Sequence, residues 1–137
     1  MSNILIVDDE KVVIELYSRV LMMGRHTVEL FMSAEEALPR ILKDPRSLDL
    51  IISDVDMLTL NGINFAYKLK RCEETQTIPI LLNSGGDFGR YSDELKELSS
   101  KGNFGYTAKP VSIEILLACA NNPKSVSKYK EYISQNL

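Results

Sequence analysis

The composition of this chain is that of one globular domain. It has 137 residues, 45% of them hydrophobic, and a net charge of -3. The scattered basic residues argue against a nucleic-acid-binding surface. No apolar run approaches the roughly 20 residues of a membrane span, and the first residues do not resemble a signal peptide. We therefore expect a cytoplasmic protein whose two cysteines, Cys72 and Cys119, are reduced thiols.

Short apolar runs alternate along the chain with longer stretches of helical periodicity. The runs predict strands over residues 3–7, 27–31, 48–53, 78–82 and 103–107. The stretches predict helices over residues 10–23, 34–43, 63–71, 87–100 and 112–120. This alternation is typical of a parallel sheet with helices on both faces. It predicts a doubly wound (βα)5 fold of the α/β class, flavodoxin-like, with strand order 2-1-3-4-5.

Local signals support the first two helices. The first contains apolar residues about one helical turn apart, which we expect to be buried: Val13, Leu16, Tyr17 and Val20. Ser33 and Glu36 have the spacing of a capping box, which predicts the start of the second helix. Pro39 falls inside that helix and predicts that it is short or kinked.

Acidic residues follow two of the predicted strands. Asp8 and Asp9 come directly after the first strand, and Asp54 follows the third. In an open α/β sheet the functional groups lie just beyond the carboxyl ends of the strands. Ser84 and Lys109, which follow the fourth and fifth strands, are expected at the same edge. The sequence thus predicts a site that combines carboxylates, a hydroxyl and an ammonium group.

These residue types suit a magnesium site and phosphoryl chemistry. Mg²⁺ prefers oxygen ligands and keeps several waters. We expect Asp9 and Asp54 to bind it directly, Asp8 through water, and Asp56 through its backbone carbonyl. The ion offsets the repulsion between the clustered carboxylates. Asp54 is the expected nucleophile toward phosphorus, with Lys109 and Ser84 contacting the phosphoryl oxygens.

The ordered set of motifs resembles the receiver domain of bacterial two-component response regulators. The resemblance covers residues 1 to about 120 and leaves 121–137 as a C-terminal extension. It rests on the site residues together with a loop after the third strand and a run after the fifth: Asp8-Asp9, Asp54, Met57, Gly62, Ser84 and Tyr106-Thr107-Ala108-Lys109-Pro110.

The resemblance implies that Asp54 accepts a phosphoryl group from a phosphohistidine. The donor would be a sensor histidine kinase or a histidine phosphotransfer protein, and the domain would catalyse only its own phosphorylation and dephosphorylation. Ser84 and Tyr106 would be the switch pair, with Tyr106 moving from an exposed to a buried position. An unknown output protein would bind the face built from residues 87–100, 103–107 and 112–120.

Four positions depart from the family pattern. Leu58 stands where proline is usual, Asn61 where aspartate is usual, and Gly85 where alanine is usual. Asp56 places an acid two residues after the acceptor, at a variable position. These changes leave the metal and acceptor groups intact and bear on the lifetime of the phosphoryl group and the stiffness of the switch.

Two other interpretations remain open. One is a receiver-like scaffold that binds partners without phosphorylation. The other is a phosphatase, because Asp54-Val55-Asp56 is similar to the D-x-D signature of haloacid-dehalogenase-like hydrolases. In those enzymes the D-x-D motif lies on the first strand, whereas here Asp8 and Asp9 come first, so the order of the acids argues against this class.

The final residues have a pattern of their own. Asn122-Pro123 predicts a break after the fifth helix. Val126, Tyr129 and Ile133 fall on one side of a possible short helix, which we expect to pack on the domain. A partner-binding tail and a linker to a further domain remain alternatives, so the chain is a stand-alone regulator or part of a larger one. The single histidine, His26, lacks other metal ligands nearby in sequence, and we expect a structural or exposed role for it.

Overall fold

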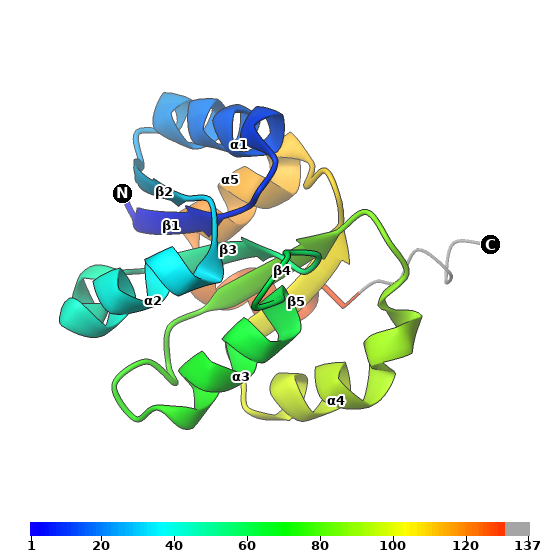
Figure 1. The fold of residues 1–137 in the computed structure, drawn as a ribbon. Coiled ribbons are helices and arrows are strands. Elements are labelled where there is room, and N and C mark those ends of the chain that lie inside the picture. Colours follow the sequence, from blue (N-terminus) through cyan, green and yellow to red (C-terminus); the bar gives the residue numbers. More distant parts are fainter. Residues whose placement is uncertain (131–137) are drawn as a thin grey trace.

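A five-stranded parallel sheet organises the protein (Figure 1). The computed structural model describes residues 1–130. The strand order is β2-β1-β3-β4-β5, which confirms the predicted α/β topology. The strands are β1 (Asn3–Val7), β2 (Thr27–Phe31), β3 (Leu50–Asp54), β4 (Ile80–Ser84) and β5 (Phe104–Ala108).

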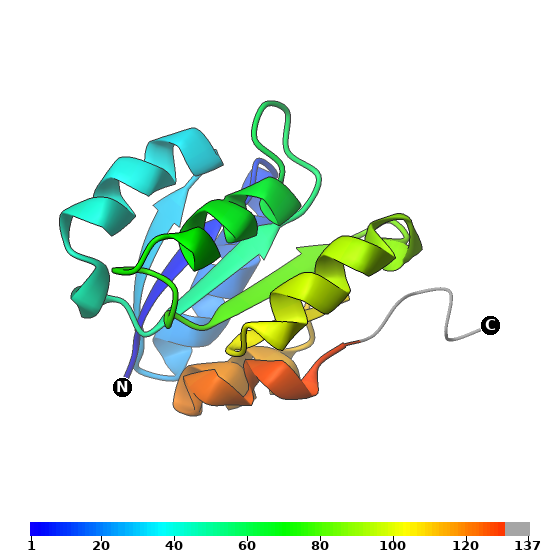
Figure 2. The ribbon, with the colours of Figure 1, turned by 90° about the horizontal axis from the view of Figure 1, so that it is seen from below.

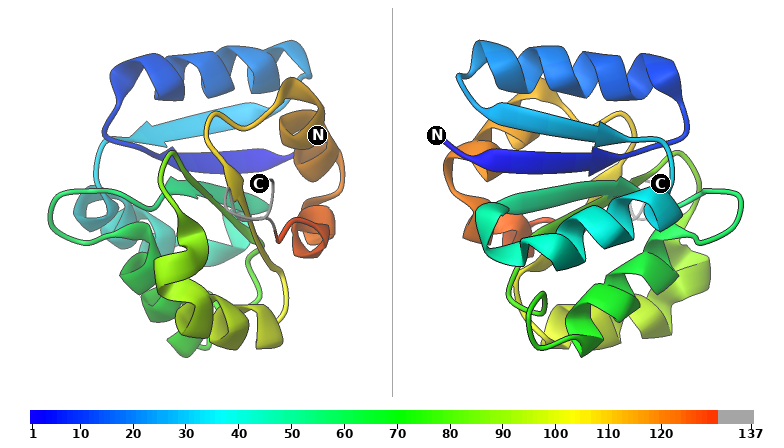
Figure 3. Two further views of the ribbon diagram at one scale, coloured as in Figure 1. Left: turned by 90° about the vertical axis from the view of Figure 1, so that its right-hand side faces the viewer. Right: turned by 60° about the vertical axis from the view of Figure 1, so that its left-hand side comes forward.

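Helices cover both faces of this sheet. Figure 3 shows α1 and α5 on one face and α2, α3 and α4 on the other. The helices are α1 (Lys11–Met23), α2 (Ala34–Lys43), α3 (Gly62–Arg71), α4 (Ser92–Ser100) and α5 (Ile113–Asn121). Short 3₁₀ helices add η1 (Pro45–Ser47), η2 (Phe88–Tyr91) and η3 (Pro123–Lys128).

The side chains of the strands alternate between two cores. In β1, Leu5 and Val7 pack against the side of α2, α3 and α4. Ile4 and Ile6 pack against the side of α1 and α5. This period of two is the geometry of a strand that is buried on both faces, and it explains why the strands appear in the sequence as nearly continuous apolar runs.

Strand ends differ from the predicted ones in a way that matters for the site. β3 and β4 each run to the polar residue that was expected beyond them. Asp54 pairs with Asn83, and Ser84 pairs with Ala108. The pairing register between parallel strands therefore holds Asp54 and Ser84 within the sheet itself. An apolar pattern cannot reveal this, because it ends where the polar residues begin.

Caps explain where several helices begin. The Ser33 hydroxyl accepts a hydrogen bond from the Glu36 amide, as the predicted capping box requires. Ser112 caps α5 and so lies just outside the helix that was predicted to include it. The predicted helix over residues 87–100 is in fact η2 followed by α4, since the Asp87 side chain accepts from the Gly89 amide and starts a 3₁₀ turn.

Two predictions for the first helices need correction. The buried stripe of α1 consists of Ile14, Tyr17 and Leu21, whereas Leu16 is 45% exposed. The fully buried stripe therefore shares only Tyr17 with the prediction, while Val13 and Val20 are partly buried and pack against the same core. Pro39 does not shorten α2, which spans Ala34–Lys43 as predicted.

His26 and the cysteines have structural surroundings. His26 is buried, its Nδ1 accepts from the Ser2 amide at 3.0 Å, and its Nε2 lies 3.1 Å from Asn121 Oδ1. Its expected structural role is thus supported. Cys72 is partly exposed and Cys119 is buried, and both are free thiols. Within residues 1–130, every helix is too short or too polar to cross a membrane.

The Tyr17 hydroxyl links three segments beneath the functional edge. It is fully buried, donates to Asn83 Oδ1 at 2.8 Å and accepts from the Val111 amide at 2.9 Å. The Asn83 side chain donates in turn to the Ser53 carbonyl. This network ties α1 to the ends of β3 and β4 and to the segment after β5.

Replacing Tyr17 tests this network. Tyr17→Phe leaves Asn83 Oδ1 and the Val111 amide without their partner, so we expect unfolding free energy to fall by about 2–3 kcal/mol. Urea denaturation measures it. The matched control is Tyr67→Phe, whose partly exposed hydroxyl donates to Glu97; we expect it to cost less than about 1 kcal/mol. Equal losses in the two variants would contradict a special role for Tyr17.

Candidate metal and acceptor site

The ammonium of Lys109 lies among three carboxylates at the carboxyl edge of the sheet. Its Nζ is 3.1 Å from Asp8 Oδ2, 3.4 Å from Asp54 Oδ2 and 2.6 Å from Glu10 Oε1. Asp8 and Asp54 are almost fully buried, and the Lys109 side chain is 8% exposed. The ends of β1, β3 and β5 therefore meet at one point, as their order in the sequence predicted.

The acids at this point have the arrangement of a cation site. Asp8, Asp9, Glu10 and Asp54 each offer a carboxylate oxygen, and these atoms lie within 4.8 Å of one another. Asp8 Oδ2 is buried and receives no hydrogen bond from the described residues, although Lys109 Nζ is near it. A buried carboxylate oxygen without a donor and an all-oxygen set suit a hard divalent cation such as Mg²⁺.

Glu10 is a member of this cluster that sequence reasoning missed. It follows Asp8 and Asp9 directly, at a position where the sequence pattern predicts only the start of a helix. Its backbone amide donates to Asp8 Oδ1 at 2.8 Å, and its side chain reaches Lys109. Three consecutive acids after a strand were the available signal.

Burial and mutual repulsion shift the ionisation of the two inner acids. Burial, with a contribution from the Asp8 charge, raises the pKa of Asp54 to about 6, against the opposing effect of Lys109. Burial likewise raises the pKa of Asp8. Burial disfavours the Lys109 charge, but hydrogen bonds to Glu10 and Asp8 and the attraction of Asp54 raise its pKa overall. The ionisation of each of these groups thus depends on the charges of the others.

Gly62 brings the following loop against the acceptor strand. A Cβ atom at position 62 would lie 2.2 Å from the Asp54 carbonyl oxygen, closer than any real contact. The Gly62 amide donates to the Val55 carbonyl at 2.9 Å. Asn61 caps α3 by accepting from the Asn64 amide, so asparagine here performs a clear structural role. Leu58, at the tip of this loop, is 99% exposed.

The Ser84 hydroxyl is bound to the Asp56 side chain. The Ser84 hydroxyl donates to Asp56 Oδ2 at 2.8 Å and accepts from the Gly86 amide at 3.0 Å. The other carboxylate oxygen of Asp56 pairs with Arg90 at 2.8 Å. The side chain of Asp56, the acid at the variable position, is therefore paired on both oxygens. It connects the serine to η2.

Tyr106 differs from the expected starting position. Its side chain is already buried, at 5% exposure, and its ring lies 5.1 Å from that of Phe88 and 6.2 Å from that of Phe104. The structure thus shows the inward position, which was expected only after phosphorylation. The aromatic partners could not be predicted, because Phe88 belongs to a 3₁₀ turn within the segment that was predicted as helix.

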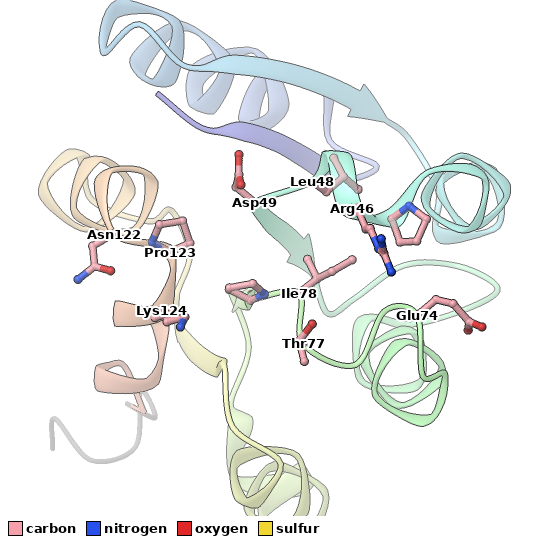
Figure 4. Close-up of a pocket in the computed structure, with 11 residues that line it drawn as sticks. Arg46, Leu48, Asp49, Glu74, Thr77, Ile78, Asn122, Pro123 and Lys124 are labelled. Carbon is pink, nitrogen blue, oxygen red and sulfur yellow. The ribbon is translucent and has the colours of Figure 1, made fainter.

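A separate hollow of about 440 Å³ lies where the strands begin, at the amino ends of β3 and β4 (Figure 4). Leu48 and Asp49 precede β3 there, Ile78 precedes β4, and Pro123 follows α5. The acids around Lys109 do not line this hollow. Its position at the amino ends of the strands separates it from the candidate site.

The close approach at Gly62 predicts a specific sensitivity. Gly62→Ala forces the loop away from the Asp54 carbonyl, so we expect a loss of about 2–4 kcal/mol in unfolding free energy and weaker Mg²⁺ binding. Gly85→Ala is the matched control, since nothing lies within 4 Å of a Cβ atom there, and we expect a change within about 0.5 kcal/mol. Urea denaturation and Mg²⁺ titration measure both. A Gly62→Ala protein as stable as the control would contradict the contact.

The raised pKa of Asp54 predicts a pH-dependent effect in the metal-free protein. With a pKa of about 6 in the fold against an ordinary 3.8, the folded state holds a proton that the unfolded chain releases. Its stabilisation is complete below pH 4 and is lost as pH rises through 6. Asp54→Asn removes the buried charge, so we expect it to raise unfolding free energy by about 1–3 kcal/mol at pH 7.5.

Chemical denaturation with a chelator present measures this gain, which should vanish near pH 4. Asp93→Asn, an exposed change in the first turn of α4, is the control and should stay within about 0.5 kcal/mol at both pH values. A less stable Asp54→Asn protein at pH 7.5 would contradict the charge balance described above.

Comparison with known proteins agrees with this geometry. The profile described as the response regulator receiver domain matches residues 4–121. Response regulator MprA of Mycobacterium ulcerans is 34% identical over 116 residues, which are 85% of this chain and 47% of that protein. The regulator RpaA of Synechocystis, described as a DNA-binding dual master transcriptional regulator, is 29% identical over 118 residues, 86% of this chain and 47% of that protein. The chain thus spans less than half the length of these relatives.

Solved structures lead to the same group. A putative response regulator from Chloroflexus aurantiacus superposes with a TM-score of 0.76 at 30% identity, covering 90% of this chain and 98% of that one. The chemotaxis response regulator CheY4 of Vibrio cholerae gives a TM-score of 0.75 at 28% identity, covering 88% and 97%. With the profile match over most of its length, this chain belongs to the receiver-domain family of two-component response regulators.

Proposed function

We propose that this receiver domain is a phospho-acceptor. In this proposal Asp54 takes a phosphoryl group from a phosphohistidine on a sensor histidine kinase or a histidine phosphotransfer protein. The observation that carries it is the position of Lys109 Nζ between the buried carboxylates of Asp8 and Asp54, 3.1 and 3.4 Å away. An ammonium group held beside a buried nucleophile can neutralise charge as it develops on a transferred phosphoryl group.

The transfer follows from the residues present. A carboxylate oxygen of Asp54 forms a bond to phosphorus while the bond from phosphorus to the donor imidazole nitrogen breaks. The imidazole leaves with the bonding electron pair and takes up a proton from water. Such a reaction depends on positioning and charge stabilisation more than on covalent machinery, which fits a site built from three strand ends and one lysine.

Asp8, Asp9 and Asp54 are the proposed Mg²⁺ ligands, with the backbone carbonyl of Asp56 as a further one. When bound, the ion supplies positive charge against the acceptor and the phosphoryl oxygens. The donorless oxygen of Asp8 and the 4.8 Å acidic cluster support this assignment. Glu10 pairs with Lys109 and so helps to hold the ammonium in place.

Ser84 and Tyr106 are the proposed switch residues. To contact a phosphoryl oxygen, the Ser84 hydroxyl has to leave Asp56 Oδ2, which it now reaches at 2.8 Å. Asp56 is thus a competitor for the hydroxyl, and its pairing with Arg90 sets how readily it gives way. An output partner then binds the face formed by α4, β5 and α5. Phosphorylation favours one of two pre-existing states of this face, and the partner binds that state.

The two alternatives have different consequences. A scaffold that works without phosphorylation needs neither Mg²⁺ nor an acceptor. A phosphatase of the D-x-D type needs the second aspartate as a general acid, but Asp56 is engaged by Ser84 and Arg90. The acceptor proposal alone predicts that one phosphoryl group is added and retained on the protein.

Mass spectrometry after incubation with a small phosphodonor and Mg²⁺ tests the acceptor. We expect the chain to gain one phosphoryl group, and we expect Asp54→Asn or removal of Mg²⁺ to reduce the gain at least about a hundredfold. Asp93→Asn changes an exposed carboxylate that is not part of the acidic cluster, and this variant should gain the group as the unmodified chain does. Uptake by Asp54→Asn would refute the assignment. Failure of the unmodified chain to take up any group would favour the scaffold, and steady release of phosphate would favour the phosphatase.

A further inference from the structure

The helix α1 is apolar on both of its faces. Its inner face packs on the sheet through Ile14, Tyr17 and Leu21. Its outer face carries further large apolar side chains that are exposed, which we call the α1 patch: Val12, Leu16, Met22 and Met23. A helix that is apolar all round is normally covered on all sides. The outer face of α1 therefore has the composition of an interface.

The members of the α1 patch lie together along the helix. Successive residues of an α-helix are separated by about 100°, so the four side chains fall within an arc of about 120°, opposite the buried face. Glu15 and Arg19 lie in the same arc, one turn apart, and both are exposed. The patch thus combines apolar contact surface with one charge of each sign.

The segment after α5 covers other parts of the domain. Figure 2 shows η3, in red, continuing from α5. Val126 of η3 is buried in the core, and its carbonyl lies so close to Gly105 that a Cβ atom there would overlap it. The Tyr106 amide donates to the Tyr129 carbonyl at 2.8 Å, and Tyr106 also forms a parallel bridge with Lys130. This segment therefore packs on α5 and β5, and residues 1–130 leave the α1 patch exposed.

A hollow of about 290 Å³ extends the patch from α1 onto α5. It is lined almost entirely by apolar side chains of these two helices and by the glycine that follows α1: Val20, Met23, Gly24, Ile113 and Leu117. Ile113, at the start of α5, is itself 56% exposed. The hollow offers room for an apolar side chain from a second molecule.

The charges beside the patch match those of a second copy of this helix. Neither Glu15 nor Arg19 forms an ion pair within residues 1–130. Two copies of α1 can pack antiparallel about a twofold axis at the level of Tyr17, which makes the same surface meet itself. Residues 15 and 19 are equally far from this level, so Glu15 of each copy faces Arg19 of the other. A partner with a single sign of charge would leave one of the two unpaired.

The same register also matches the apolar side chains. Residues 12 and 22 are equally far from residue 17, so Val12 of each copy lies level with Met22 of the other. That end of α1 lines the hollow through Met23. Val12, which is 80% exposed, is a small apolar side chain of the kind that the hollow can accept. One arrangement therefore satisfies both the charges and the apolar surface.

We propose that the α1 patch is a self-association surface, on which a second copy of this chain packs its own α1 antiparallel to the first. Each copy contributes the same residues, as in other twofold pairs. One helix face and the start of α5 make an interface at the small end of the range for proteins, so the pair forms reversibly. It requires neither Mg²⁺ nor phosphorylation at Asp54 and is thus separate from the proposed function.

Sedimentation equilibrium of the full chain between about 10 µM and 1 mM tests this surface. We expect a monomer–dimer equilibrium with a dissociation constant of about 0.1 mM. Arg19→Glu and Glu15→Arg each place like charges opposite one another, so each should raise this constant at least about tenfold. Lys96→Glu, an exposed change on α4 at the other face of the sheet, is the matched control for Arg19→Glu and should leave it unchanged.

An equimolar mixture of the Glu15→Arg and Arg19→Glu proteins tests the register. Each variant opposes its own kind, but in the mixture two arginines of one chain face two glutamates of the other. We therefore expect the mixture to regain association within about threefold of the unmodified chain. Val12→Ser, which leaves the charges as they are, should weaken association at least about threefold.

All of these substitutions are at exposed positions, so we expect each variant to fold. A chain that stays monomeric up to 1 mM would overturn the proposal and assign the patch to a different protein. Association that both charge reversals leave intact, or that Lys96→Glu weakens as much as Arg19→Glu does, would also overturn it. A mixture that stays monomeric would do the same.

Discussion

Charge balance around one lysine is the constraint on which this domain depends. Two carboxylates, Asp8 and Asp54, are withdrawn almost completely from water, and each makes the other harder to ionise. The positive charge of Lys109 offsets the repulsion between these carboxylates. Lys109 follows β5, the last strand in the sequence. The parallel sheet brings the ends of β1, β3 and β5, which are far apart in sequence, to one place. The topology thus supplies the position of the site, and the buried charge of Asp54 lowers the stability of the metal-free fold at neutral pH.

Most of the fold and the inner site could be predicted from local sequence. Alternating apolar runs and helical stretches fix the class, and the rule that strand ends share an edge gathers Asp8, Asp54 and Lys109. These features are readable because they depend on short-range pattern and on topology. The predicted ends of β3 and β4 fell short because strand pairing, unlike hydrophobicity, continues through Asp54 and Ser84.

What could not be predicted depends on contacts between distant residues. The pairing of Asp56 with Ser84 and Arg90 joins the loop after β3 to the end of β4 and to η2, and tertiary packing sets their approach. The buried position of Tyr106 also depends on tertiary packing, since its ring lies against those of Phe88 and Phe104. Val126 and Tyr129 were expected to pack on the domain, and they do, whereas Ile133 lies outside the described residues. The match of Gly105 to this packing is invisible in sequence, since a glycine in a strand has several explanations.

The two outer strands of the sheet, β5 and β2, differ in how their free backbone groups are covered. β5 is closed by residues 129 and 130, while β2 forms the other end of the strand order. Unpaired strand margins are the usual route by which folded proteins join into fibres. Here the main chain of residues 129 and 130 already pairs with Tyr106 of β5, so another chain can add at that point of β5 only by displacing these residues. Among the described residues, β2 is therefore the end strand that has no such pairing and the one more open to another chain.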